Sequence, residues 1–275
     1  MATKTWFVTG ISRGFGRTLC EELLRRGHKV VGTTRNGTSG PAHQNLIELP
    51  LDVSDEKQTH EAIAQAIAKA GRIDVVVNNA GFGLVGAVEE VSTAEARHVF
   101  ETNFFGTWNV IRAVLPHLRA NRSGHIVNFS SIGGITGSMG NGLYNASKFA
   151  VEGLSEALEV ELKPFGITVT IVEPGYFRTD FLSSSSIQQA AKVIDAYAET
   201  AGATRNAVSA RSGSQPGDPA KAVAVIIDAV ESHAPPLRLP LGPDAFARID
   251  AKIARLRQDM DQWQAAASDT QFDSQ

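Results

Sequence analysis

Tyr144 and Lys148 lie four residues apart in the sequence Tyr-Asn-Ala-Ser-Lys, and Ser131 precedes the tyrosine by thirteen residues. If this segment is helical, residues at this spacing project from the same face, so the amine can lie beside the phenol. An ammonium about 4 Å from a phenolate stabilises it by on the order of 4 kcal/mol, enough to move the pKa of a phenol from about 10 to roughly 7. The pair therefore predicts a tyrosine that exchanges protons near neutral pH. An ordinary, partly exposed helix pair has the same spacing, so the surrounding motifs must decide.

A glycine-rich turn near the start of the chain follows strand-like residues and precedes helix-like ones. Glycines let the backbone approach a phosphate, and the amides at the start of a helix face the anion. This context favours a pyrophosphate-binding turn of a dinucleotide fold over a plain tight turn. The residues of the turn that we expect at the dinucleotide are Gly10, Ser12, Arg13, Gly14, Phe15 and Gly16.

Two arginines predict which dinucleotide binds. Arg13 lies within the glycine-rich turn, and the second strand-like run ends in Thr33-Thr34-Arg35, with no Asp or Glu to bind a free ribose 2'-hydroxyl. Guanidinium groups at Arg13 and Arg35 suit a 2'-phosphate, which they can bind by forked, charge-assisted hydrogen bonds. We therefore predict NADP(H) over NAD(H). The alternative is that both arginines are solvated surface residues.

The elements that must position these residues alternate between short apolar strands and helices. Buried parallel strands with helical crossovers give a sheet covered on both faces. The pattern predicts an α/β, doubly wound Rossmann fold with about seven parallel strands in the order 3-2-1-4-5-6-7. Strands are expected at Thr5–Val8, Lys29–Thr33, Leu46–Leu51, Ile73–Asn78, His125–Ser130, Thr168–Val172 and Leu237–Leu241, and helices at Arg17–Arg26, Glu56–Lys69, Thr93–Thr102, Phe104–Ala120, Asn145–Lys163 and Pro219–Glu231.

Composition narrows the partners. The chain has 275 residues, 43% of them hydrophobic and 20% charged, with a net charge of -3. This balance offers no basic field for nucleic acid or an anionic membrane, so a small-molecule partner is expected. The single cysteine, Cys20, is expected to be buried in a helix; it excludes an intramolecular disulfide and a cysteine zinc cage, and no metal site is predicted. No apolar run approaches the about 20 residues of a membrane span, and no signal pattern is present, so a cytoplasmic location is expected.

The chain divides into a catalytic part and a C-terminal extension. We expect one Rossmann-type domain over residues 1–242, in which residues 181–217, rich in Ser, Ala and Gly, cover the substrate. Residues 243–275 form an amphipathic helix and tail, with an apolar seam that must be covered. Packing on its own domain or over the pocket is the preferred interpretation, and pairing across a subunit interface is the alternative. The seam residues are Phe246, Ile249, Ile253, Leu256, Met260 and Trp263.

The order of the motifs resembles the short-chain dehydrogenase/reductase family. From Thr5 to Thr179 the chain carries TGxxxGxG, Asn-Asn-Ala-Gly at 78–81, Asn103, Ser131, the Tyr144 and Lys148 pair, and Pro-Gly at 174–175. The joint occurrence at this spacing is far more specific than any one motif. The resemblance implies hydride transfer between a nicotinamide dinucleotide and a ketone, aldehyde or secondary alcohol.

The resemblance also implies a role for each catalytic residue. Tyr144 would act as general acid and base, and Lys148 would lower its pKa and hold the nicotinamide ribose. Ser131, and not the preceding Ser130, would orient the substrate oxygen. Asn103 would hold a water that links Lys148 to solvent; the alternative is that it marks a structural kink in a helix.

Further residues are assigned to the dinucleotide by the same resemblance. Asp52, with Val53 beside it, would meet the adenine, although a helix-capping role for Asp52 or Ser54 is the alternative. The backbone of Asn79, Ala80 and Gly81 would line the adenosine side. After the sixth main strand, the Phe177 amide and the Thr179 hydroxyl would bind the nicotinamide carboxamide. The flanking Pro174 and Gly175 complete this motif, for which a plain turn after the strand is the alternative.

Apolar residues next to the catalytic positions predict the kind of substrate. Because charged residues are sparse among them, an apolar carbonyl compound or alcohol is favoured over a phosphorylated one, although the same residues could be core. The expected walls are Phe82, Leu84, Met139, Leu143, Tyr176 and the segment that begins at Phe181. A homodimer or homotetramer through the helices that hold Asn103 and Tyr144 is implied by the resemblance. The alternative functions are an NADP(H)-sensing module without catalysis and an epimerase or dehydratase.

Overall fold

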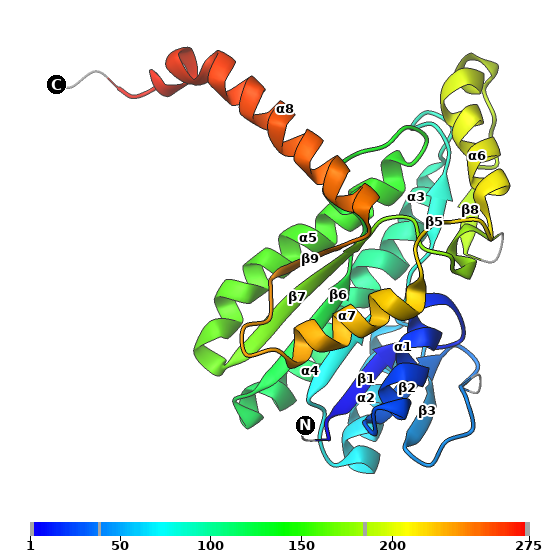
Figure 1. Cartoon of the computed structure of the whole chain (residues 1–275), viewed down its shortest axis with the longest axis vertical. Coiled ribbons are helices and arrows are strands. Elements are labelled where there is room, and N and C mark those ends of the chain that lie inside the picture. Colours follow the sequence, from blue (N-terminus) through cyan, green and yellow to red (C-terminus); the bar gives the residue numbers. More distant parts are fainter. Residues whose placement is uncertain (1–2, 38–39, 184–185, 273–275) are drawn as a thin grey trace.

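The computed structural model describes residues 3–37, 40–183 and 186–272 (Figure 1). The expected pocket-covering segment includes 184–185 and the expected C-terminal tail includes 273–275, and both lie outside the described residues. Seven parallel strands form the central sheet, in the order β3-β2-β1-β4-β6-β7-β9. Counted within this sheet, the order is 3-2-1-4-5-6-7, as predicted. The strands are β1 (Thr5–Thr9), β2 (Lys29–Thr34), β3 (Leu46–Pro50), β4 (Val75–Asn78), β6 (Gly124–Phe129), β7 (Ile167–Pro174) and β9 (Arg238–Leu241).

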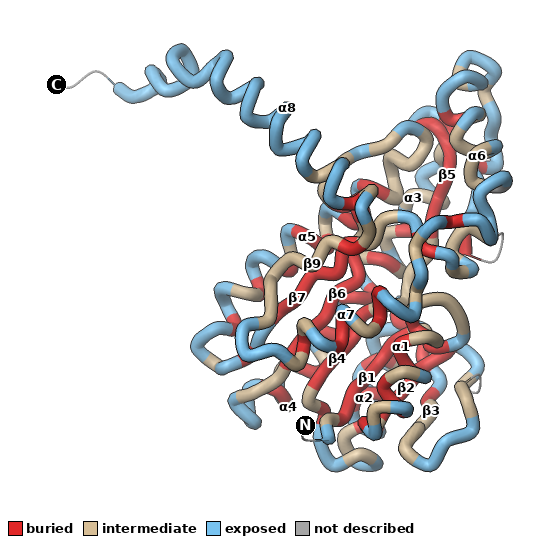
Figure 2. The backbone as a smooth tube through the Cα atoms, viewed as in Figure 1, coloured by how far each residue is buried: buried red, intermediate tan, exposed pale blue. Residues whose placement is uncertain are grey.

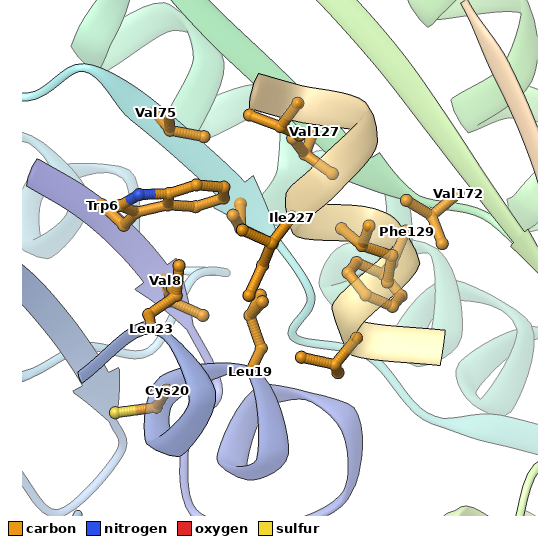
Figure 3. Close-up of a cluster of buried hydrophobic side chains, with 14 of the residues drawn as sticks. Trp6, Val8, Leu19, Cys20, Leu23, Val75, Val127, Phe129, Val172 and Ile227 are labelled. Carbon is orange, nitrogen blue, oxygen red and sulfur yellow. The ribbon is translucent and has the colours of Figure 1, made fainter. Parts of the chain in front are cut away.

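Helices cover both faces of the sheet, because successive side chains of each strand point to opposite faces. On one face, Trp6 and Val8 of β1 pack against Leu19 and Leu23 of α1 and Ile227 of α7 (Figure 3). On the other, Phe7 packs in a second buried cluster with residues of α2, α4 and α5. Cys20 is buried, as expected. The covering helices are α1 (Gly14–Arg25), α7 (Pro219–Glu231), α2 (Glu56–Ala70), α4 (Gly106–Asn121) and α5 (Gly142–Leu162).

One predicted break between helices is a change of helix type. Helix α3 (Thr93–Phe100) continues through a π-helical turn (Glu101–Phe105) directly into α4. The turn contains Asn103, the residue at which the sequence separated two helices. A π turn widens the helix by one residue, so the side chains on either side of it face different directions.

A second layer of structure lies above the carboxyl ends of the main strands (Figure 1). Strand β5 (Gly83–Val85) pairs in parallel with β8 (Ile187–Gln189), about a hundred residues further along the chain. Helix α6 (Ala203–Arg211) follows in the same segment. The segment expected to cover the pocket therefore contains a strand and a helix that the sequence did not predict.

The C-terminal helix α8 (Pro243–Ser268) extends away from the rest of the protein (Figure 1). Ala245 is buried and Ile249 is partly buried, but every described residue from Asp250 onward is exposed (Figure 2). The preferred expectation, that this helix packs along its own domain, is therefore wrong beyond its first two turns. The other sides of the helix carry charged residues, and no other part of the described chain covers the seam.

Candidate active site

The glycine-rich turn adopts a backbone that side chains would block. Gly10 and Gly14 have φ angles of 73° and 55°, the left-handed region that favours glycine. At Gly16, a Cβ atom would lie 2.2 Å from the carbonyl oxygen of Gly10, so only glycine lets α1 approach the turn this closely. Arg13, the residue before α1, makes no side-chain cap, and the first turn of the helix contains no acidic residue. The amides at the start of α1 are therefore well placed to bind an anion.

The neighbouring strand end braces this turn. The Asn79 side chain donates to the carbonyl oxygens of Thr9 (2.8 Å) and Gly10 (3.1 Å). In return, the Thr9 hydroxyl accepts from the amides of Asn79 and Ala80, both at 3.0 Å. Asn79 therefore supports the turn with its side chain, in addition to any backbone contact with a ligand.

Two of the residues that are candidates for binding the ribose and the adenine are exposed. Arg35 follows β2 and Asp52 follows β3, and their side chains line the same cavity as the half-buried Arg13. The carboxylate of Asp52 accepts hydrogen bonds from the backbone amide (3.0 Å) and hydroxyl (2.7 Å) of Ser54. Helix α2 is capped by Asp55, whose side chain accepts from the Gln58 amide. Neither of the two expected capping residues therefore caps the helix, and Asp52 remains at the cavity.

Ser131, Tyr144 and Lys148 come together from two elements. Ser131 follows β6, and its Oγ accepts a hydrogen bond from the Gly133 amide at 3.0 Å. Tyr144 lies in the first turn of α5, and its hydroxyl is hydrogen bonded to Ser131. One helical turn later, the Nζ atom of the buried Lys148 donates to the Phe129 carbonyl oxygen at 2.8 Å. The phenol, the hydroxyl and the amine thus face one cavity.

Burial governs the proton affinities of this group. It raises the pKa of Tyr144 to about 12, against a smaller opposite effect of the Ser131 hydrogen bond. Burial also lowers the pKa of Lys148 to about 8, opposed by the negative charge of Glu152 one turn further along α5. The sequence predicted a lowered pKa for Tyr144. The structure differs because removing a phenolate from water costs more than this hydrogen bond returns.

Asn103 is fully buried and connects the π turn to the site. Its Oδ1 accepts from the Phe82 amide, and its Nδ2 donates to the Phe82 carbonyl oxygen, both at 3.0 Å. The same Nδ2 lies 3.1 Å from the Ser147 hydroxyl. A side chain at Gly81 would meet both Asn103 Oδ1 and Lys148 Nζ, so these two atoms lie on the same side of that backbone. The π turn matches the expected kink, and the position beside Lys148 is compatible with the expected relay.

One cavity of about 620 Å³ unites the glycine-rich turn and the catalytic candidates. Of the predicted catalytic and cofactor-binding residues, only Gly16 and Asn103, which are both buried, do not line it. The predicted residues on the wall are Gly10, Ser12, Arg13, Gly14, Phe15, Arg35, Asp52, Val53, Asn79, Ala80, Gly81, Ser131, Tyr144, Lys148, Pro174, Gly175, Phe177 and Thr179.

The residues expected to surround a substrate line the cavity in part. Phe82, Met139, Tyr176 and Phe181 line it as expected. Leu84 and Leu143 do not. In β5, alternation places Gly83 on the wall, and the neighbouring Leu84 is buried on the opposite side.

The segment above the cavity contributes residues that the sequence did not indicate. Helix α6 provides Thr204, Ala207, Val208 and Arg211, and α8 provides Arg248. The Arg211 guanidinium lies over the Tyr176 ring, 5.5 Å from its centroid. No motif marks these positions, because their place at the cavity depends on how a segment distant in sequence folds back.

A buried ion pair anchors this segment. Arg205 of α6 donates to both carboxylate oxygens of Glu90, at 2.7 and 3.1 Å. The same carboxylate accepts from the amides of Ala87 (2.7 Å) and Ile194 (2.9 Å), so it joins α6 to the loop after β5. The Arg205 hydrogen bonds lower the pKa of Glu90 to about 2.

A second buried charge cluster involves α5, the helix that carries Tyr144 and Lys148. The Arg238 guanidinium of β9 contacts Glu152 of α5 and Glu173 of β7, with 2.7 Å to the latter. Glu173 is fully buried, and burial raises its pKa to about 7, reinforced by the Glu152 charge. Glu173 immediately precedes Pro174, so this cluster joins the elements that hold both ends of the candidate site.

Two other kinds of feature are absent from the described residues. Within these ranges, no three His, Cys, Asp or Glu side chains cluster in a way that could hold a metal ion. Nor does any helix in the described part of the chain have the length and apolar character needed to cross a bilayer.

Comparisons with known proteins give a consistent result. The family model described as short chain dehydrogenase matches residues 4–190. The chain is 39% identical to oxidoreductase BOA17 of Botryotinia fuckeliana, over 88% of this chain and 90% of that protein. It is also 39% identical to the 3-ketodihydrosphingosine reductase of Bacteroides thetaiotaomicron, over 86% of this chain and 87% of that protein.

Solved structures resemble the whole chain. A short-chain dehydrogenase from Streptomyces avermitilis has a TM-score of 0.91 and 40% identity, and covers 98% of this chain and 99% of its own. A short-chain dehydrogenase from Burkholderia cenocepacia in complex with NADP has a TM-score of 0.74 and 26% identity, over 94% and 95% of the two chains. A Burkholderia phymatum protein in complex with NAD, at 22% identity and a TM-score of 0.79 over 95% of each chain, shares the fold.

Proposed function

The chain belongs to the short-chain dehydrogenase/reductase family, and from this membership we propose that it is an NADP(H)-dependent oxidoreductase that interconverts a carbonyl group and an alcohol. One observation carries the proposal: the glycine-rich turn and the group of Ser131, Tyr144 and Lys148 line the same cavity. A dinucleotide held at the turn can therefore extend to the residues that move a proton.

The residues divide the reaction between proton transfer and orientation. When bound, a reduced nicotinamide supplies the hydride that converts a carbonyl carbon to a carbinol. The Tyr144 hydroxyl donates its proton to the substrate oxygen, and the Ser131 hydroxyl fixes that oxygen by a hydrogen bond. The Lys148 ammonium stabilises the phenolate that Tyr144 leaves behind. Asn103 holds the Phe82 backbone beside Lys148 and supports the path by which solvent returns the proton.

The proton affinities of the site give Tyr144 and Lys148 the protonation states from which carbonyl reduction starts. A Tyr144 pKa raised to about 12 keeps the phenol protonated throughout the neutral range, as a proton donor requires. The Lys148 pKa of about 8 leaves most of the amine charged at neutral pH. In the loaded enzyme, this charge works to bring the pKa of the phenol back toward neutrality.

The proposed preference for NADP(H) depends on Arg13 and Arg35. Both line the cavity at the ends of the elements that hold an adenosine ribose in this fold, and β2 ends without a carboxylate. Solved relatives with NADP and with NAD both have this fold, so the arginines, and not the comparison, support the choice. Asp52 and Val53 would then flank the adenine.

The other end of the dinucleotide and the domain boundary complete the assignment. The Phe177 amide and the Thr179 hydroxyl would hold the nicotinamide carboxamide. Thr179 lies beside the glycine-rich turn, since a Cβ added at Gly14 would lie 3.7 Å from the Thr179 Cβ. Residues 1–242 would form the catalytic domain, with residues 181–217 above the substrate.

We propose an apolar carbonyl compound with a chain or ring system as the substrate. The cavity walls next to Tyr144 are aromatic and aliphatic, including Phe82, Met139 and Phe181. One relative, 39% identical to this chain, is named a 3-ketodihydrosphingosine reductase, and the name describes a ketone as its substrate. Arg211 and Arg248 also line the cavity and add positive charge to its wall.

The test is NADPH oxidation with a panel of long-chain, aryl and polycyclic ketones, with a 3-keto long-chain amine included. We expect turnover with NADPH, and the matched Tyr144→Phe variant should lose about 10²- to 10⁴-fold in kcat while it still binds NADPH. Tight NADPH binding without turnover of any ketone or alcohol would instead indicate a sensing module. Conversion of substrate without net NADPH consumption would indicate an epimerase or dehydratase.

A further inference from the structure

Helix α8 presents an uncovered apolar seam. The helix has 26 residues, and from its third turn onward no other described part of the chain shields it (Figure 2). Single apolar residues at a surface are ordinary, but a row of large ones along one helix is not. The exposed fractions are 54% for Phe246, 59% for Ile253, 52% for Leu256, 51% for Met260 and 62% for Trp263, and Ile249 between them is partly exposed.

The spacing of the seam is that of a coiled coil. Counting from Phe246, the apolar residues recur at alternating intervals of three and four, which places them at the a and d positions of a heptad. A strict a and d seam is narrower than the apolar face of a helix that packs on a globular domain. Its natural partner is therefore another helix with the same repeat.

We propose that α8 pairs with α8 of a second copy of this chain as an antiparallel two-stranded coiled coil. In such a pair, the a position of one helix faces the d position of the other. Ile253 then faces the partner's Leu256 at the centre, and Ile249 faces the partner's Met260. At the ends, Phe246 faces the partner's Trp263. The arrangement has twofold symmetry, so every contact occurs twice.

The charges beside the seam select the antiparallel direction. In this register, Asp250 lies next to the partner's Arg257, and Lys252 lies next to the partner's Asp259. Each pair occurs twice because of the twofold symmetry, and each joins opposite charges. In a parallel pair, Lys252 would instead face the partner's Arg257, which is repulsive. Arg257 also contacts Asp261 of its own helix at 3.1 Å, an exposed pair that the new contact would extend.

The shape of the molecule permits this pairing. A helix of 26 residues is about 39 Å long and leaves the rest of the protein at its first turns (Figure 1). In an antiparallel pair, the two globular parts lie at opposite ends, so neither obstructs the other. The seam covers fewer than three heptads, so the association should be reversible and concentration-dependent. It adds to any contact that the chains make through α4 and α5.

The first test measures mass by sedimentation equilibrium over a range of protein concentrations. We expect the Ile253→Asp variant to have half the mass of the wild-type assembly, because it places charges at the central layer. The matched control, Ala251→Asp, introduces the same charge on the outer face and should leave the mass unchanged. Both sites are exposed, so urea unfolding should show that neither variant loses stability.

The second test determines direction. Ile253→Cys and Leu256→Cys proteins are oxidised separately and as a mixture; Cys20 is fully buried and gives little background. An antiparallel pair brings position 253 of one chain next to position 256 of the other, so the disulfide forms chiefly in the mixture. Crosslinking of either protein alone to the same extent would indicate parallel helices and would overturn the register.

Charge reversal gives an independent check of the same register. Arg257→Asp should weaken the antiparallel pair, since it places Asp250 next to an aspartate, and the added Asp250→Arg change should restore it. A parallel pair would be strengthened by Arg257→Asp alone. A wild-type protein whose mass is the same as that of Ile253→Asp at every concentration would overturn the proposal. If that protein binds lipid vesicles through the seam, the seam's partner is a membrane.

Discussion

Replacing Glu173 by glutamine should make the protein more stable at alkaline pH and leave it nearly unchanged at acidic pH. Glu173 is fully buried at the end of β7, where its Oε1 lies 2.7 Å from Arg238. Its other oxygen, Oε2, has no hydrogen-bond partner among the described residues. Arg238 also serves Glu152 and the exposed Glu156, so one guanidinium faces three carboxylates. Ionising Glu173 in this setting costs free energy.

The magnitude follows from the pKa. Burial, and then the charge of Glu152, raise the pKa of Glu173 from 4.5 to about 7. An acid whose pKa is raised on folding contributes stability that is fully present below its unfolded pKa. That stability is lost as the pH rises through the folded pKa. The loss amounts to about 3 kcal/mol above pH 7, at about 1.4 kcal/mol for each tenfold change in proton affinity.

Urea unfolding at several values between about pH 4 and about pH 8.5 measures this difference. We expect the Glu173→Gln variant to match the wild type at the acidic end and to exceed its unfolding free energy by about 3 kcal/mol at the alkaline end. Glu156→Gln is the matched control, since that carboxylate is exposed and contacts the same arginine. A difference between variant and wild type that does not change with pH would refute the reasoning. It would mean that Arg238 keeps Glu173 ionised.

Three further predictions concern the candidate site. Arg35→Ala should raise the KM for NADPH by about tenfold, because it removes one exposed charge-assisted hydrogen bond, and should change the KM for NADH little. Steady-state kinetics measures both constants. An equal rise in KM for the two cofactors would contradict the assignment. Gly16→Ala should lower the unfolding free energy by about 1–3 kcal/mol and weaken dinucleotide binding, because the added Cβ would lie 2.2 Å from the Gly10 carbonyl oxygen. Gly153→Ala, where an added Cβ meets nothing within 4 Å, should leave stability equal or higher. The rate of ketone reduction should fall as the pH rises through about 8, where Lys148 loses its charge, and in a Lys148→Met variant the remaining activity should show no such step.

The sheet order and most of the residues that line the cavity could be predicted from the sequence, because both depend on local signals. Buried parallel strands appear as short apolar runs, and the positive φ angles of Gly10 and Gly14 require glycine. Strands β5 and β8 could not be predicted, because each has three residues and each needs the other to form. The same reason hides the residues of α6 at the cavity, whose position depends on the buried contact between Glu90 and Arg205.

Proton affinity was the harder property to predict. The spacing of Tyr144 and Lys148 does bring them to one cavity, but the amine donates to the Phe129 carbonyl oxygen, and burial opposes the charged form of each group. Spacing determines which groups meet, whereas pKa depends on the water that each group loses, and that water is excluded by residues distant in sequence.

The seam of α8 shows most clearly the difference between properties that follow from local sequence and properties that depend on what packs against it. The heptad spacing from Phe246 to Trp263 is visible in the sequence and is preserved on the helix. The preferred partner, the protein's own domain, was wrong because periodicity defines a surface without naming what covers it. Charge order supplies the missing information: Asp250, Lys252, Arg257 and Asp259 complement an identical helix only when it runs in the opposite direction. A partner can thus be inferred from a single chain when its surface is complementary to itself.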